Sequence, residues 1–479
     1  MGLFDSTSFL IFLCVVALLY YLLPILLKKD GLQTLILIGA GVSLYACLDV
    51  FYALSLSGCC LINEAFVIVM YRFRAKGNDR ARKAAAGIGI AVNVLILFFF
   101  KYSGLFSLLI FGDGELTSFF LGLPLPLGIS FYTFHAVSML ADLSGGTEAE
   151  EAENGFWKRS AGVFCYLTFF ANSVSGPVTK YNDFRPQIRR HFFKEVDLRK
   201  IFEYLVLGYF FKLCVANNIQ NYTIDLTETD FSGKSPITIL VQMFAYSCQI
   251  FADFAAYSYI AIGIALLFGY RLPKNFDFPY ISKSITEFWK RWHISLSSWL
   301  KQYIYFSLGG NRKGKVRTYI NLMVVMLVGG IWHGADWKYL LWGALHGLFL
   351  VLERMGGHLM TGREKKKENA LLSFVRMIVS FTIVSWLWLF FKMNGYGAVL
   401  SATKQIFTGW RYMMVIDTTA ILMACFYMFP VFAFHAVYLA GRNGKWLKGE
   451  NWKYFFYGAM LLALLLNRGT SSAFIYFQY

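Results

Sequence analysis

Two histidines stand inside apolar sequence, so both imidazoles are expected to lie at membrane depth. His333 follows the stretch Gly329–Trp332, and His346 comes thirteen residues after it in a second Trp- and Gly-containing run. Imidazole has a reference pKa of about 6.5, so its neutral form can take a proton from a hydroxyl near pH 7. An ionisable side chain in a membrane segment indicates a functional site. For either histidine alone a hydrogen-bonded packing role stays open, but two of them flanked by Gly and Trp favour a site.

The elements that must position these histidines are the two arms of a membrane hairpin. Arg317 ends a basic stretch, and His333 lies sixteen residues beyond it, which is up to about 24 Å of helix rise. We predict a turn at 334–336 and a return through His346 to Glu353. Each arm is expected to be short for a full span, as in a thinned region of the bilayer.

A third histidine lies in residues 285–308, which we predict to form one amphipathic helix that lies along the inner leaflet or dips into the protein. His293 and Arg291 flank Trp292 there, a richer polar set than a plain interfacial anchor requires. An interfacial anchor stays open as the alternative. The apolar residues that recur at spacings of three and four, and so share one face, are Phe288, Trp292, Leu296, Trp299 and Tyr303.

The composition of the 479-residue chain is that of a polytopic membrane protein. Hydrophobic residues make up 57% and aromatic residues 19%, and the mean hydropathy is +0.52, which excludes a soluble globular domain and a disordered chain. Forty-five Lys and Arg against 28 Asp and Glu give a net charge of +17, which we assign to cytoplasmic loops. We expect contact with membrane lipids and none with nucleic acid. The eight cysteines show no metal-binding spacing, so we predict no metal and no disulfide framework.

The apolar segments predict an all-α polytopic protein with about eleven membrane crossings. Prolines and glycines interrupt residues 121–143 and 161–178, which predicts kinked or re-entrant helices there; a kinked, fully packed helix stays open. Lys28 and Lys29 mark the inner end of the first span. The predicted location is the plasma or inner membrane, with both termini extracytoplasmic.

Further motifs extend from about residue 120 to the C-terminus. They are PLGISFYTFH (126–135), GPVTKYNDFRPQ (176–187), QIFADF (249–254), LPKNF (272–276), EFWKRWHISLSS (287–298), LGGNR (308–312), WHG (332–334) and FIYFQY (474–479). As a set they resemble the membrane-bound O-acyltransferase (MBOAT) family, in its bacterial alginate O-acetylation (AlgI-like) branch. The related D-alanine transfer protein of teichoic acid modification (DltB-like) shares the Arg-Trp-His and Trp-His-Gly elements, whereas the Leu-Gly-Gly-Asn-Arg segment favours the acetylation branch.

The resemblance implies an MBOAT fold of transmembrane and re-entrant helices around a central tunnel. It divides the chain into N-terminal helices (1–120), a catalytic core (121–468) and an extracytoplasmic tail (469–479). It also implies transfer of an acyl group, with acetyl as the expected one, from a cytosolic thioester to an extracytoplasmic hydroxyl of a cell-envelope polysaccharide. The donor would be acetyl-CoA or the phosphopantetheine of an acyl carrier protein, with no tightly bound cofactor. The expected partners are the cytosolic donor or carrier protein and an extracytoplasmic acetyltransferase or esterase-like protein.

The resemblance also assigns residues. His333 corresponds to the catalytic histidine of the family and His293 to its second histidine. A site inside the membrane disfavours imidazolium, which keeps such a base neutral. The supporting or tunnel residues expected beside them are His346, Trp292, Arg291, Trp332, Asn311 and Asp253.

The last residue has a possible role of its own. The terminal FIYFQY motif resembles the end of the small peptide that accompanies the D-alanine system, so Tyr479 could carry the acyl group as a relay. A phenol has a pKa of about 10, well below that of a sugar hydroxyl, so onward transfer from a tyrosine ester is downhill. A tail of aromatic residues at the outer interface stays open as the alternative.

Two other functions stay open. The first is D-alanyl transfer to teichoic acid, which differs in its donor. The second, from another class, is a transporter or flippase. A transporter predicts intramembrane charge pairs or repeated broken helices, whereas the sequence suggests only the scattered Asp142 and Asp253.

Overall fold

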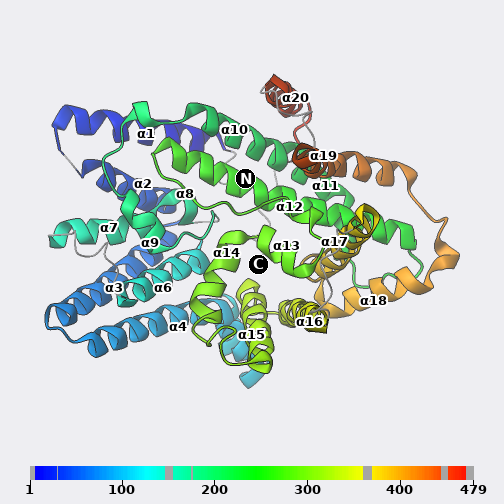
Figure 1. Cartoon of the computed structure of the whole chain (residues 1–479), viewed down its shortest axis with the longest axis horizontal. Helices are drawn as coiled ribbons and strands as arrows, with labels where there is room; N and C mark the ends of the chain where they lie inside the picture. The colour runs from blue at the N-terminus through cyan, green and yellow to red at the C-terminus, as the bar shows by residue number, and fades with distance from the viewer. Residues whose placement is uncertain are drawn as a thin grey trace. The chain divides into compact units, whose positions relative to one another are not determined.

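The computed structural model describes residues 6–29, 31–145, 155–173, 176–359, 369–443 and 451–470. Over these ranges the chain consists of helices, turns and extended segments, without a β-strand (Figure 1). This confirms the predicted all-α polytopic class, while the total of about eleven crossings stays a prediction. The seven described helices that are long and apolar enough to cross a membrane are α1 (Thr7–Leu27), α3 (Val50–Ala75), α4 (Asp79–Phe111), α12 (Pro236–Leu267), α15 (Lys315–His333), α17 (Ala370–Lys392) and α19 (Thr418–Asn443).

The chain folds into two compact units. The first comprises Met1–Gly2, Glu203–Ile260 and Lys274–Tyr479, and the second comprises Leu3–Phe202 and Ala261–Pro273. The division into three segments that we expected from the sequence stays a prediction.

In the second unit, helices from the N-terminal part of the chain pack side by side. Helix α3 packs on α4, which in turn packs on α6 (Ile129–Gly145) (Figure 1). Asn63 and Asn93 exchange two amide hydrogen bonds of 3.0 Å across the buried contact of α3 and α4, so neither polar group is left without a partner in the apolar interior. Helices α1, α2 (Leu32–Leu48) and α7 (Phe156–Thr168) complete this packing, with α2 contacting both others.

The two segments rich in proline and glycine are interrupted, as predicted. In the first, α5 (Glu115–Leu121) ends before a non-helical stretch, and α6 begins at Ile129. In the second, α7 ends at Thr168 and the short helix α8 (Phe170–Ser173) follows an extended Phe169. Thr179 lies outside the helices, and its carbonyl oxygen accepts a 2.7 Å hydrogen bond from the Tyr166 hydroxyl. A side chain thus supplies the hydrogen bond that this backbone group lacks outside a helix.

The first unit holds the C-terminal helices. These are α13 (Ile285–Arg291), α14 (Ile294–Leu300), α15, α16 (Trp337–Leu359), α17, α18 (Gly395–Thr408), α19 and α20 (Asn451–Leu466), together with most of α12. Helix α16 packs against α15, α13, α17 and α18. It therefore has a central place among the helices that carry the histidines.

The hairpin that carries His333 and His346 consists of α15 and α16. The turn between them lies at residues 334–336, as predicted. For α15 the prediction of an arm too short for a full span is wrong, because its 19 residues are long and apolar enough to cross a membrane. Helix α16 has 23 residues but is not among the helices that meet both criteria, so for this arm the prediction stays open. Gly329 and Gly330 lie within α15 instead of ending it, and Gly330 faces α16 at a close crossing of the two helices.

This crossing depends on two glycines. A Cβ added at Gly330 would lie 2.3 Å from the carbonyl oxygen of Tyr339, and one added at Gly343 would lie 2.4 Å from the carbonyl oxygen of Met326. Both contacts are with backbone of the facing helix, which cannot move aside as a side-chain end can. Small residues at such positions let membrane helices approach closely.

We expect Gly343→Ala to destabilise the protein although alanine favours helices. The added methyl group forces α15 and α16 apart, and such overpacking typically costs about 1–3 kcal/mol. Gly356→Ala in the same helix is the matched control, since its Cβ meets nothing within 4 Å and replacing a helical Gly by Ala there is expected to raise stability slightly. Thermal unfolding of the purified variants compares the two. Equal midpoints for Gly343→Ala and Gly356→Ala would contradict the close crossing.

Candidate active site

The helix predicted over residues 285–308 is interrupted at His293. Helix α13 ends at Arg291, and α14 begins at Ile294 and continues into the π-helical turn Lys301–Tyr305. His293 has a left-handed backbone, with φ of 44° and ψ of 52°. The prediction of one continuous helix is therefore wrong.

The extended segment that lies between α12 and α13 explains the interruption. The backbone N–H of Ile294 donates to the carbonyl of Asn275 at 2.9 Å, and the N–H of Asp277 donates to the carbonyl of Arg291, also at 2.9 Å. Backbone groups released at the break thus find partners in residues 275–277. Left-handed backbone is costly for a non-glycine residue and persists where surrounding contacts impose it, often at functional sites.

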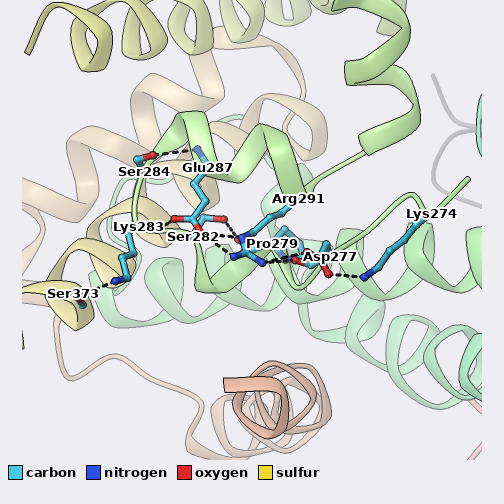
Figure 2. A network of polar contacts seen from close by, with 9 residues as sticks. All are labelled: Lys274, Asp277, Pro279, Ser282, Lys283, Ser284, Glu287, Arg291 and Ser373. Carbon is cyan, nitrogen blue, oxygen red and sulfur yellow. Dashed lines mark hydrogen bonds and ion pairs between the residues drawn. The ribbon is translucent and has the colours of Figure 1, made fainter. Parts of the chain in front are cut away.

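Arg291 belongs to an ion-pair network that fixes this segment (Figure 2). Its Nη2 lies 2.9 Å from Glu287 Oε1, and its Nη1 donates to the carbonyl oxygen of Asp277 at 3.0 Å. Lys283, in the same network, donates from its backbone N–H to Glu287 Oε2 at 3.0 Å and from Nζ to Ser373 at 2.8 Å. Arg291, which we expected to support a tunnel, therefore supports the loop that holds His293.

Helix α16 fixes α13 at two points. The Glu353 carboxylate accepts hydrogen bonds from the backbone N–H groups of Ile285 at 2.6 Å and Thr286 at 2.8 Å. Two turns earlier on α16, Nδ1 of His346 accepts a 3.2 Å hydrogen bond from Trp289 Nε1. Indole N–H can only donate, so neutral His346 carries its proton on Nε2. His346 therefore joins the hairpin to the interrupted helix.

The three histidines, far apart in sequence, form one row of contacting rings. The centroid of His293 lies 6.4 Å from that of Trp332, which lies 4.8 Å from His333. His333 lies 5.2 Å from Trp342, and Trp342 lies 4.7 Å from His346. His293, His333 and His346 are exposed by only 1%, 5% and 0% of their surface. The structure thus brings together the histidines that the sequence singled out.

Aromatic rings wall this row of histidines. Phe254 meets His293 edge to face at 4.6 Å, and Phe391 meets His333 at 4.9 Å. Trp292, expected as a supporting residue, is 99% buried and packs against Trp388 at 4.9 Å. The sequence analysis missed Trp388 and Phe391, because they lie in the apolar run of α17, where nothing distinguishes them from ordinary core residues.

Asn275 is a further residue that the sequence analysis missed. Its Oδ1 accepts from the backbone N–H of Ser295 at 3.3 Å and lies 3.0 Å from His293 Nδ1, while its Nδ2 donates to the Ser258 hydroxyl at 3.0 Å. A backbone N–H can only donate, so the amide orientation is determined and the oxygen faces His293. Burial lowers the pKa of His293 to about 3, so this ring is neutral. It carries its proton on Nδ1, and Nε2 keeps its lone pair.

We expect Asn275→Ala to lower the rate of the expected acyl transfer at least tenfold. The buried Nδ1–H of His293 loses its acceptor, and the ring loses its orientation. Asn275→Asp keeps an acceptor but adds a negative charge, which raises the pKa of His293. Its activity should therefore be weakest at low pH and recover as the pH rises and the ring becomes neutral. Ser258→Ala is the control, because it leaves the contact with His293 in place. Initial rates between pH 5 and 9 test this; identical pH profiles for Asn275→Asp and the unsubstituted chain would contradict it.

Two other expected supporting residues lie outside the row of histidines. Asn311 is exposed, in the turn that precedes α15; the buried amide nearby is that of Asn321, which donates to the carbonyl of Gly310 at 2.7 Å. Asp253 is buried but pairs with Lys212 Nζ at 2.7 Å. A supporting role of either residue at the histidine site stays a prediction. Tyr479 lies outside the described residues.

Comparison with known proteins finds a family domain and several relatives. Residues 161–395 match the model of MBOAT, the membrane-bound O-acyltransferase family. The chain is 36% identical over 262 residues to the probable alginate O-acetylase of Pseudomonas aeruginosa, which covers 54% of this chain and 48% of that protein. It is 31% identical over 330 residues to the peptidoglycan O-acetyltransferase of Helicobacter pylori, covering 64% and 61% of the two proteins.

A more distant relative is the teichoic acid D-alanyltransferase of Streptococcus thermophilus, 29% identical over 243 residues, covering 47% of this chain and 56% of that protein. The chain spans about half the length of the curated relatives it matches. The interrupted helix with His293 and the end of α15 with His333 both lie inside the matched segment. Residues 161–395, just under half of the chain, therefore carry a domain of the membrane-bound O-acyltransferase type.

Proposed function

We propose that this chain transfers an acyl group, with acetyl as the leading candidate, from a cytosolic thioester to an extracytoplasmic hydroxyl of a cell-envelope polysaccharide. The observation that carries the proposal is the pair of buried imidazoles, His293 and His333, on one indole, Trp332, at the end of a membrane helix. The relatives named as O-acetyltransferases support acyl transfer, and their substrates support a polysaccharide acceptor.

In the proposed reaction His333 acts as the base. It takes the proton of the attacking hydroxyl while the hydroxyl oxygen forms a bond to the thioester carbonyl carbon. The carbon–sulfur bond breaks, and the thiolate receives the proton back from the His333 imidazolium, so the products are an ester and a free thiol. Proton transfer by a positioned imidazole contributes about 10²- to 10⁴-fold to such a reaction. The aromatic rings around His333 exclude water, which would otherwise hydrolyse the thioester.

His293 has the complementary role in this proposal. It lies in an interrupted helix that we assign to the cytoplasmic side, where the thioester would enter. Its ring is held by Asn275 on Nδ1, so Nε2 is the nitrogen available to orient the donor. The passages that would lead the thioester and the hydroxyl to the site, the orientation of the termini and the residence in the bacterial inner membrane are parts of the same proposal.

The relay through Tyr479 remains a separate hypothesis. In that route His333 would activate the Tyr479 phenol, and the tyrosine ester would pass the acyl group to an extracytoplasmic acetyltransferase or esterase-like partner. Tyr479→Phe removes only the hydroxyl, so it should abolish polymer acylation while leaving the protein in the membrane. Tyr476→Phe, in the same motif, is the matched control. Normal polymer acylation in the Tyr479→Phe strain would remove the relay and leave direct transfer.

Two measurements test the proposed function. Purified chain is mixed with acetyl-CoA or with an acetylated acyl carrier protein, and thiol release is followed with and without a polysaccharide acceptor. Mass analysis of the envelope polymer from a strain lacking the chain then identifies the lost group. Loss of polymer acetate together with acceptor-dependent thiol release supports the proposal; an unchanged polymer and no thiol release would reject it.

D-alanyl transfer is the second candidate, and the similarity to a teichoic acid D-alanyltransferase favours it. It differs in the donor, a D-alanyl-loaded carrier protein, and would show as loss of polymer alanine instead of acetate. A transporter or flippase was expected to contain intramembrane charge pairs, and the sequence suggested only scattered acidic residues. That description is wrong for Asp253, which forms a buried ion pair with Lys212. Thioester turnover by the purified chain separates a transferase from a transporter.

A further inference from the structure

A groove of about 1030 Å³ lies in the second unit, apart from the histidines. It is formed where α2 and α7 begin and where the loop at residues 188–190 passes them. Four basic residues line it, and none of its described lining residues is acidic. These four are Lys29, Lys158, Arg189 and Arg190.

The placement of charge at the groove does not serve helix stability. Helix α2 follows Gly31 and α7 follows Gly155, and neither glycine provides a side-chain cap. Acidic residues stabilise the positive N-terminal end of a helix, and basic residues oppose it. Nevertheless Lys158 stands in the first turn of α7, and Lys29 precedes α2 by three residues. Among the described residues, the groove therefore gathers positive charge that an anion would relieve.

The loop that carries the two arginines is fixed to α2. Gln33 Nε2 donates to the carbonyl of His191 at 2.8 Å, and the His191 backbone N–H donates to Gln33 Oε1 at 2.9 Å. Arg189 also pairs with Glu195 at 3.8 Å. The loop with the two arginines is thus held in place by these contacts. For the two lysines, no ion pair is seen within the described residues.

Apolar residues of α2, a short apolar helix, and of α7 also line the groove. Ile38 lies six residues after the start of α2, which is about 9 Å of helix rise, and Phe164 lies six residues after Lys158 on α7; both line the groove. Trp157, beside Lys158, is exposed, as is typical of tryptophan at the membrane–water interface. Charge at one level and apolar surface deeper along the helices match a lipid, not a soluble anion.

We propose that this groove binds an anionic glycerophospholipid, with its phosphate at Lys29 and Lys158 and an acyl chain along Ile38 and Phe164. Basic pockets between membrane helices at the cytoplasmic side are suited to such headgroups. The inference goes beyond the proposed acyl transfer and does not depend on it, since no residue of the groove belongs to the histidine site.

The probe is dioleoyl phosphatidylglycerol, compared with phosphatidylcholine of the same acyl chains. Native mass spectrometry of the full-length purified chain measures how much of each lipid stays bound. We expect a preference for phosphatidylglycerol, which Lys29→Gln with Lys158→Gln should reduce about tenfold, since each lysine contributes to binding an anionic lipid. The matched control is Lys76→Gln with Lys83→Gln, which removes two charges near the junction of α3 and α4, outside the groove, and should leave the preference unchanged.

A second variant tests the apolar wall while all four cations remain. Ala161→Phe adds a ring within the groove and should reduce binding of both lipids at this site. Equal binding of the two lipids to the unsubstituted chain, or an unchanged preference in the double lysine variant, would overturn the proposal. Displacement of phosphatidylglycerol by inorganic phosphate or desulfo-CoA at millimolar concentration would also overturn it, because the ligand would then be a soluble phosphate compound.

Discussion

Replacing His333 by Gln is expected to lower the rate of acyl transfer by about 10²- to 10⁴-fold, the usual contribution of a general base. Gln is polar and of similar size, so it can fill the space between Trp332, Trp342 and Phe391, but it cannot take a proton near pH 7. The loss should appear in the rate of thiol release at saturating donor, since the proton is transferred in the chemical step.

His435→Gln is the matched control for this variant. His435 is also buried, with Nδ1 2.8 Å from the carbonyl oxygen of Val431. Its ring contacts the rings of Phe251, Phe278 and Tyr280. Its replacement should therefore alter stability more than the rate of transfer. If His333→Gln and His435→Gln lose activity only in proportion to lost folded protein, His333 is a packing residue and not the base.

The second large effect concerns the buried pair of Lys212 and Asp253. Both side chains are only 3% exposed and lie 2.7 Å apart. Asp253→Ala would leave the ammonium group of Lys212 in an apolar interior without its counter-charge, and breaking such a pair costs about 3–5 kcal/mol. We therefore expect a strong fall in the thermal midpoint and in the amount of protein recovered from membranes.

The double variant Lys212→Met with Asp253→Leu should recover most of this loss, because replacing both charges by apolar groups of similar volume is often neutral. Asp197→Ala is the surface control, since the Lys200–Asp197 pair is largely exposed and solvent screens it. The midpoints of the four proteins separate the cost of an unpaired charge from that of lost packing. A double variant as unstable as Asp253→Ala would contradict this reading, and a stable double variant without activity would give the pair a functional role.

The membrane class and the main site residues could be read from local sequence. Hydropathy depends on each short segment alone. The spans of α1, α12 and α17 and the hairpin turn at residues 334–336 were therefore predictable. Histidine is conspicuous in apolar sequence because it is costly there. For that reason His333, His346 and His293 were all found, and their motifs indicated the family before any contact between them was known.

The helix interruption at His293 was decided by tertiary structure. The local periodicity around His293 is that of one continuous helix. Hydrogen bonds with residues 275–277 stabilise the break and the left-handed backbone of His293. The same holds for Asn275, whose motif was recognised but whose contact with His293 was not. Hydrogen-bond partners outside a segment leave no periodic pattern in the segment that they alter.

Tertiary structure also decided which expected supporting residues reach the site. Asp253 and Phe254 are neighbours on α12, yet the carboxylate faces Lys212 and the ring faces His293. Successive residues of a helix point about 100° apart, so a small rotation of α12 decides which of them meets the histidines. Sequence by itself determined which segments enter the membrane and which side chains are costly there, because both are properties of single segments. Packing decided their partners, because a contact depends on the rotation and spacing of two helices at once.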